Sequence, residues 1–150
     1  MLGLLLTADP ARDAVSRYMR SATIYTAKEA NNLVGIAAIT KASPEPSQSR
    51  GTEPELGLEL KNIAVISERQ GEGIAKQLIN AVKAHAGQTG ATSLMVGTGN
   101  SSLSQLALYQ KCGFRLSHVI PDFFSDYPEP IFENGIPCID MVVLKINFKD

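Results

Sequence analysis

The residues best suited to chemistry form a short glycine-containing stretch, 70–75, which follows a strand-like segment and opens a helix-like one. The N-terminus of a helix presents unpaired backbone N–H groups and a partial positive charge. Glycine lets the backbone approach an anion without interference from a Cβ atom. Strand, tight turn and helix together therefore favour a cradle for a pyrophosphate group. The pattern matches neither the dinucleotide-binding G-x-G-x-x-G nor the phosphate loop ending in Gly-Lys-Ser/Thr, and a glycine-rich turn without a ligand is the alternative.

The segment 56–65 leads into this turn, and its apolar pattern changes phase halfway along. Leu58 and Leu60 occupy alternate positions, but the next apolar residue in the series is Ile63. Because alternation in a strand has a period of two, a slip of one residue would turn the second half inside out. One unpaired residue near Lys61–Asn62 would repair the pattern, so we predict a β-bulge there.

The other periodic segments alternate between strand-like and helix-like patterns, and this order predicts one α/β domain over residues 1–150, with a mixed sheet covered by helices. Ser102 and Gln105 have the spacing of a capping box, which places a helix start at Ser102. We expect a strand at 2–6, a helix from Asp9-Pro10 to about Arg20, a hairpin of 22–30 and 33–40 turning at Asn31-Asn32, a helix over 71–85, a strand at 92–96, a helix from Ser102 to Lys111-Cys112, and strands at 114–120 and 139–148. Gly113 is expected to stop the helix before it as a left-handed residue.

Two polar segments are predicted to be loops. Residues 43–54 are rich in proline, serine and charge, which indicates a mobile loop. Residues 121–137 mix aromatic and acidic side chains. Such a segment can line an acceptor site and attract a cationic amine, or it can be a surface loop that covers the sheet.

Composition excludes several classes of partner. The chain has 150 residues, a formal net charge of -1 and scattered Lys and Arg, so neither nucleic acid nor a membrane surface is expected to bind it. No apolar run approaches the roughly 20 residues that span a bilayer, and the short apolar start lacks the features of a signal peptide. Cys112 and Cys138 have neither disulfide-framework nor zinc-ligand spacing, and His85 and His118 stand apart. We expect a cytoplasmic protein without a metal.

The glycine-containing turn is part of a longer resemblance. Gln70-x-x-Gly73-x-Ala75 resembles the Gln/Arg-x-x-Gly-x-Gly/Ala signature of GNAT-type N-acetyltransferases. Further along, residues 108–114, Leu-Tyr-Gln-Lys-Cys-Gly-Phe, resemble the second signature of that family, Leu-Tyr-x-x-x-Gly-Phe. On these two motifs the chain is identified as a member of the family, with the resemblance covering most of residues 33–120.

The resemblance implies a fold and a cofactor. The fold is a mixed, mostly antiparallel sheet of about seven strands, with a splayed, β-bulged central pair and three to four flanking helices. The cofactor is acetyl-CoA, which serves as the acetyl donor. Its pyrophosphate would be held by backbone N–H groups of the turn, and its pantetheine arm by the preceding strand. The residues implied are Gln70, Gly71, Glu72, Gly73, Ile74 and Ala75 in the turn, Ile63, Ala64 and Val65 in the strand, Asn100 or Ser102 beyond it, and Tyr109 near the thioester sulfur.

Two side chains are candidates for catalysis by resemblance. Tyr109 matches a tyrosine whose phenol can donate a proton to the departing thiolate, and its alternative role is an aromatic core residue. Glu59 matches an acidic residue that many relatives use as a base, directly or through water, and partial burial would raise its pKa. The alternative for Glu59 is a surface glutamate paired with Lys61. Direct attack in a ternary complex needs no enzyme nucleophile, so Cys112 is expected to be structural.

The N-terminal part departs from the family, because only one helix fits before the hairpin instead of two. The missing element normally helps form the acceptor pocket, so this pocket would be open or completed by a partner subunit, as in a homodimer. The expected reaction is acetylation of a small cationic amine. Three alternatives stay open: acetylation of a protein N-terminus or lysine, a regulatory module that binds CoA without catalysis, and an unrelated phosphate-binding domain.

Overall fold

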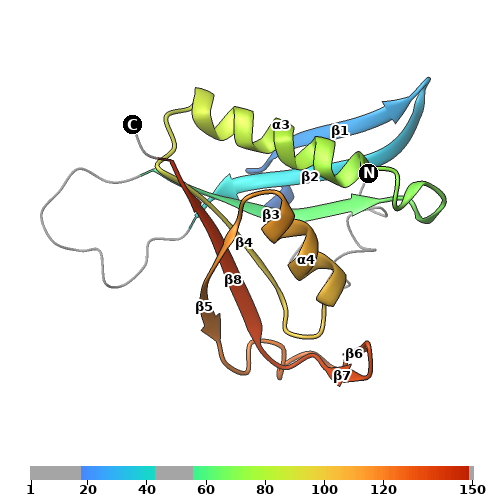
Figure 1. The fold of residues 1–150 in the computed structure, drawn as a ribbon, viewed down its shortest axis with the longest axis vertical. Coiled ribbons are helices and arrows are strands. Elements are labelled where there is room, and N and C mark those ends of the chain that lie inside the picture. Colours follow the sequence, from blue (N-terminus) through green and yellow to red (C-terminus); the bar gives the residue numbers. More distant parts are fainter. Residues whose placement is uncertain (1–17, 43–55, 149–150) are drawn as a thin grey trace, which may run out of the picture. The chain divides into compact units, whose positions relative to one another are not determined.

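The structure is a computed structural model that describes residues 18–42 and 56–148 (Figure 1). The predicted strand at 2–6, nearly all of the predicted first helix and the predicted loop at 43–54 lie outside the described residues. The chain divides into two compact units, one of residues 1–94 with 148–150 and the other of residues 95–147. That the chain is a single domain stays a prediction.

The first unit contains a three-stranded antiparallel arrangement. Strands β1 (Thr23–Glu29) and β2 (Asn32–Lys41) form the predicted hairpin. The turn lies at Ala30-Asn31, one residue earlier than predicted, and Ala30 has a φ of 54°. Strand β3 (Gly57–Val65) pairs with the other edge of β2. Most of β2 is buried, which explains why its apolar residues run almost continuously instead of alternating.

The predicted β-bulge is confirmed and lies at Lys61. Asn62 pairs with Ala38 and Leu60 pairs with Ile39, so Lys61 has no partner in the ladder and its side chain is exposed. The extra residue restores the phase of the strand, because Leu60 and Ile63 now point to the same face.

Helix α3 (Ile74–Gln88) packs on one face of these strands. It buries Leu78, Ile79, Val82 and Ala86, which follow helical spacing. Gly35 in β2 lies directly beneath the helix, and a Cβ atom there would be 3.0 Å from Leu78 Cδ1. The opposite face of the strands has a core of Ile36, Ala38 and Ala64, against which Tyr18, Met19, Ala22 and Ile24 pack.

The second unit contains most of strand β4 (Ser93–Gly99), helix α4 (Leu103–Lys111), and strands β5 (Arg115–Ile120) and β8 (Met141–Asn147). Strands β5 and β8 are antiparallel neighbours, and their bounds agree with the predicted closing strands to within two residues. The segment that joins them contains a small hairpin, β6 (Phe132–Glu133) and β7 (Ile136–Pro137), so the predicted loop at 121–137 is partly regular.

The predicted fold class is confirmed. Within residues 18–42 and 56–148, six strands belong to a mixed sheet, and β6 and β7 form a second sheet of two strands that the prediction of about seven strands in one sheet did not include. The described residues contain the α-helices α3 and α4 and the short 3₁₀ helix η2 (Ser67–Arg69), and Tyr18 and Met19 are also helical, near the end of the predicted first helix. None of the described helices has the length and apolar character needed to cross a membrane.

Candidate active site

The turn between η2 and α3 owes its shape to two glycines. Gly71 has a φ of 82° and Gly73 a φ of 84°, a left-handed conformation that side chains with a Cβ atom adopt at a cost. Gly73 is the N-cap of α3. A Cβ atom added at either glycine would meet nothing within 4 Å. The glycines are therefore required for the backbone conformation, and the side of the turn to which a Cβ would point is open.

The turn has backbone N–H groups available to an anion. Gln77 makes the first helical bond of α3, 3.1 Å to the carbonyl oxygen of Gly73, so the N–H groups of Ile74 and Ala75 precede the ladder. Within the described part of the chain, the N–H groups of residues 71–73 donate to no backbone carbonyl outside regular elements. This consecutive run of donors at a helix N-terminus suits a phosphate group.

Gln70 has a different place from the other residues of the turn. Its side-chain Nε2 donates to the carbonyl oxygen of Val65 at 3.1 Å, and its backbone N–H donates to the carbonyl oxygen of Ser67 at 3.5 Å. Both groups therefore face the protein. Gln70 therefore holds the turn to the end of β3.

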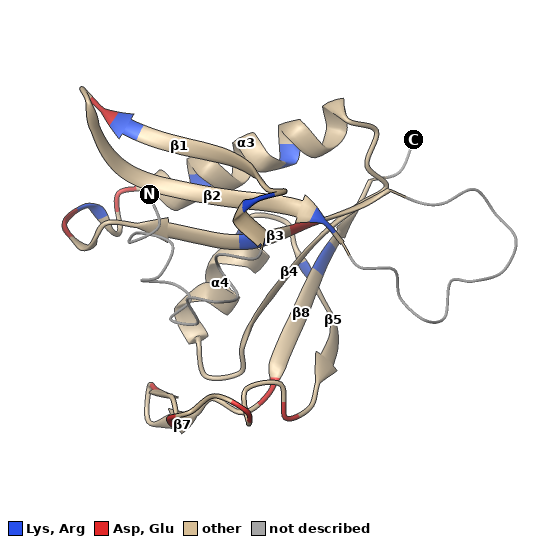
Figure 2. Ribbon diagram, turned by 180° about the vertical axis from the view of Figure 1, so that it is seen from behind, with Lys and Arg blue, Asp and Glu red and all other residues tan. Residues whose placement is uncertain are grey.

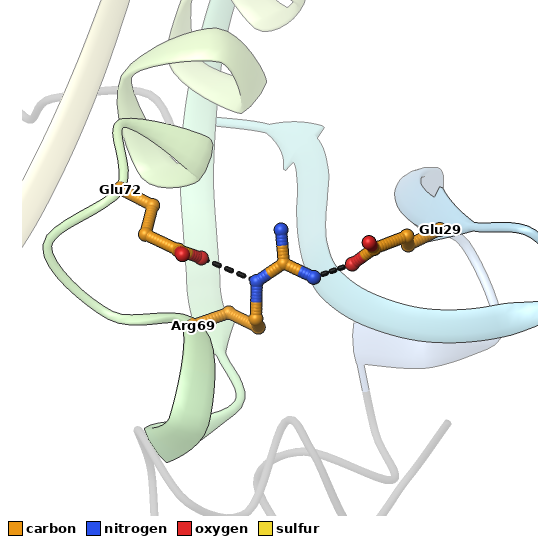
Figure 3. A network of polar contacts seen from close by, with 3 residues as sticks. All are labelled: Glu29, Arg69 and Glu72. Carbon is orange, nitrogen blue, oxygen red and sulfur yellow. Dashed lines mark hydrogen bonds and ion pairs between the residues drawn. The ribbon is translucent and has the colours of Figure 1, made fainter.

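Two cations next to the turn were missed by the sequence analysis. Arg69, the last residue of η2, contacts the carboxylates of Glu29 and Glu72 (Figure 3). Lys76 is exposed in the first turn of α3, where the helix dipole favours anions over cations. A lysine in the first turn of a helix, beside N–H groups that can bind an anion, is the sequence signal that would have identified Lys76.

The strand residues expected beside the pantetheine arm lie at the end of β3. Ile63, Ala64 and Val65 pair through one edge with Ala37, Ile36 and Gly35 of β2. Ile63 and Ala64 are buried. The bulge at Lys61 immediately precedes this stretch and sets the direction of its side chains.

Glu59 lies on β3 on the same face as Asn62, the face opposite α3. Its side chain is 19% exposed, and its carboxylate is 3.1 Å from Lys61 Nζ. The ion pair that sequence analysis gave as the alternative is therefore present. On the same face, Asn62 Nδ2 donates to the Tyr18 hydroxyl at 2.8 Å. Glu59 thus shares this face with the polar residues Thr40 and Asn62 and with the apolar core of Ile36, Ala38 and Ala64.

Tyr109 is buried on α4 and keeps its proton. Its ring packs edge-on against Phe114, with 5.7 Å between ring centres. Burial raises the pKa of the phenol well above its ordinary value, and the neighbouring Cys112 raises it further. The helix ends at Lys111 with Cys112 as its C-cap, and Gly113 beyond it has a φ of 100°, as predicted for a left-handed residue after the helix. The Phe114 N–H closes this end by donating to the Tyr109 carbonyl oxygen. Tyr109 is therefore a core aromatic residue whose phenol stays protonated at neutral pH.

The two candidates beyond β4 bind other parts of the chain. The side-chain oxygen of Asn100 accepts from the N–H groups of Ile139 and Asp140 at 2.9 and 3.0 Å, and its Nδ2 donates to the Pro137 carbonyl oxygen. Ser102 is the N-cap of α4, but its hydroxyl donates to Glu133 Oε1 at 3.0 Å. The predicted capping box is therefore wrong.

The segment that joins β5 to β8 is acidic. It carries five carboxylates, and no Lys or Arg occurs between Arg115 and Lys145, as Figure 2 shows for this segment. The carboxylates belong to Asp122, Asp126, Glu129, Glu133 and Asp140. The rings of Phe123, Phe124 and Tyr127 contact one another in sequence. A cation would find both carboxylates and aromatic faces here.

The comparisons with known proteins agree with the motifs. The sequence profile of the Acetyltransferase (GNAT) family matches residues 6–114, so the chain belongs to the GNAT family of acetyltransferases. It is 42% identical to the uncharacterised N-acetyltransferase YvbK of Bacillus subtilis over 145 residues, which are 96% of this chain and 86% of that protein. The predicted enzyme class, an acetyl-CoA-dependent N-acetyltransferase, is confirmed.

Two solved structures are similar over nearly the whole chain. A GNAT family acetyltransferase from Elizabethkingia anophelis, with acetyl-CoA bound, is 39% identical with a TM-score of 0.85 and covers 97% of this chain and 89% of its own. An acetyltransferase from Bacillus subtilis in complex with CoA is 42% identical with a TM-score of 0.86 and covers 98% of this chain and 90% of its own.

Proposed function

We propose that this protein transfers the acetyl group of acetyl-CoA to a small cationic amine by direct attack in a ternary complex. The observation that carries the proposal is the turn at 71–73, whose left-handed glycines leave a run of backbone N–H groups open at the start of α3. The acetyl-CoA and CoA bound by the two similar structures support the same ligand here.

The cofactor would be held mainly by the backbone. The N–H groups of residues 71–75 would bind the pyrophosphate, and Lys76 would add positive charge nearby. The backbone of Ile63, Ala64 and Val65 would pair with the pantetheine arm. The side chains of Asn100 and Ser102 already bind the segment 133–140, so these two residues would contact the cofactor through their backbone.

Glu59 would act as the general base. The acceptor must attack as a free amine, and a carboxylate with a mostly buried side chain can take its proton directly or through water. The ion pair with Lys61 does not remove this capacity, because a carboxylate has several acceptor positions and Lys61 Nζ occupies one side.

Tyr109 would stabilise the leaving sulfur. The amine nitrogen forms a bond to the carbonyl carbon as the carbon–sulfur bond breaks, and the electron pair of that bond stays on sulfur. Because burial raises the pKa of the phenol far above that of a thiol, complete transfer of its proton to the thiolate is uphill. We expect Tyr109 to donate a strong hydrogen bond to the sulfur, with solvent completing protonation after release.

The acidic segment between β5 and β8 supports a cationic acceptor. Five carboxylates without a compensating Lys or Arg raise the local concentration of small cations, and this attraction weakens with salt. The same charge would attract an amine of a protein, so kinetics with small amines and with a peptide distinguish the two classes of acceptor.

Replacing Gly73 with glutamate should abolish CoA binding while the protein stays folded. The substitution puts a negative charge and a Cβ atom into the anion-binding turn. Gly90→Glu is the matched control, since Gly90 also has a positive φ, 76°, and open space around it but lies beyond the other end of α3. Calorimetric titration with CoA measures the effect. Equal affinities for the two variants would exclude the turn as the pyrophosphate site.

Replacing Glu59 with glutamine should lower kcat by about 100-fold or more, the usual contribution of a general base. The pH–rate profile of the variant should also differ from that of the parent, because the variant has no carboxylate at this position. Lys61→Gln serves as the control that removes the ion pair and leaves the carboxylate. A pH–rate profile of Glu59→Gln that matches the parent would exclude Glu59 as the base.

Replacing Tyr109 with phenylalanine should lower kcat by about tenfold or more, because the ring and its packing remain while the donor to sulfur is lost. As the pKa of the phenol is raised, the group stays protonated from neutral pH to about pH 10, and the parent should show no loss of rate from its ionisation in that range. Tyr25→Phe is the control, because it also removes one phenol hydroxyl, one that is hydrogen-bonded to His85. An unchanged kcat for Tyr109→Phe would contradict the assignment.

Release of free thiol from acetyl-CoA should be saturable with a diamine, a polyamine or an amino sugar, and should weaken as ionic strength rises. A peptide with a free N-terminus and a lysine is the comparison substrate. Turnover of the peptide with none of the small amines would replace the proposal by protein acetylation. CoA binding without turnover of any amine would indicate a regulatory module.

A further inference from the structure

The turn proposed to bind pyrophosphate contains an acidic residue at its centre. Glu72 lies between Gly71 and Gly73, so its carboxylate is attached to the stretch of backbone whose N–H groups face the anion. Like charges a few ångströms apart repel each other even in bulk water, and more strongly near a protein surface. A carboxylate free to approach the turn would therefore weaken binding of any phosphate there.

Arg69 contacts that carboxylate and is itself held from the other side. Its Nε donates to Glu72, and another guanidinium nitrogen contacts Glu29, the last residue of β1 (Figure 3). The guanidinium is planar and rigid, so the contact to Glu29 sets the direction in which Nε points. Glu72 is thus drawn toward the β1 end and neutralised there.

Solvent weakens each of these contacts taken singly. The side chains of Arg69, Glu72 and Glu29 are 33%, 51% and 60% exposed. Exposed ion pairs contribute little to stability, but a network that fixes one shared cation is the case in which they matter. Loss of this network would therefore change the affinity of the turn for an anion and would have little effect on the stability of the fold.

We propose that Arg69, anchored by Glu29, is a positioning residue that holds the Glu72 carboxylate away from the pyrophosphate turn and cancels its charge. The inference rests on the proposed function of that turn. It differs from a role in which Arg69 itself binds the phosphate, because the two roles give opposite results when Glu72 is neutralised as well.

The test is a double-mutant cycle of Arg69→Gln, Glu72→Gln and the combined variant. Calorimetry with CoA gives the dissociation constant, and steady-state kinetics with acetyl-CoA give KM and kcat. Arg69→Gln should raise the dissociation constant and KM about fivefold with kcat unchanged, and the loss should shrink at high salt. The combined variant should return to within about twofold of the parent, because the charge that Arg69 compensates is gone. Glu68→Gln, at an exposed residue of η2, controls for net charge.

Each outcome decides one question. A combined variant as weak as Arg69→Gln would overturn the inference and favour direct phosphate binding by Arg69. An Arg69→Gln variant with the parent's affinity would also overturn it. A parent protein that binds no CoA would contradict the proposed function of the turn itself, which is a separate failure. Thermal unfolding of all variants should agree with the parent, so that a change in affinity is not a change in folding.

Discussion

One extra residue in β3 determines which side chains reach which face of the first unit. If Lys61 were paired in the ladder, Ile63 would face away from α3, and the helix would lose part of the surface on which it packs. With it, Leu60 and Ile63 lie toward α3, while Glu59 and Asn62 lie on the other face. The bulge therefore allows one strand to support the helix that follows the turn and to present a carboxylate on the opposite side.

The turn after β3 illustrates recognition by backbone conformation. The two glycines of the turn adopt the left-handed conformation, the N–H groups of residues 71–73 donate to no backbone carbonyl outside regular elements within the described residues, and the side chain of Gln70 fastens the turn to the end of β3. A turn held in this way before a ligand arrives would leave little ordering to be done on binding. In the proposed arrangement the charged side chains around it, Arg69 and Glu72 among them, would modify affinity without forming the site.

Local patterns predicted the features that depend on neighbours in sequence. The phase slip in 56–65 located the bulge, and the spacing of Gly71 and Gly73 located the turn, because both follow from period and backbone preference. Features that depend on distant partners were missed. The hydroxyl of Ser102 binds Glu133, 31 residues away, which no capping rule foresees. The Asn134-Gly135 pair is a hairpin signal that sequence analysis overlooked, and both residues have a positive φ, as a two-residue hairpin turn requires.

The bonds that hold the segment between β5 and β8 divide it into two parts with different freedom to change. Glu133, Asn134, Pro137, Ile139 and Asp140 are fastened to residues 100–102. Within 123–130, the Phe124 N–H donates to the Ile139 carbonyl oxygen, a backbone bond that a change of side chain leaves in place. Substitutions can therefore accumulate in that stretch without loosening its anchor. A family built on this plan could diversify its acceptors by altering a few exposed positions while its cofactor turn stays the same.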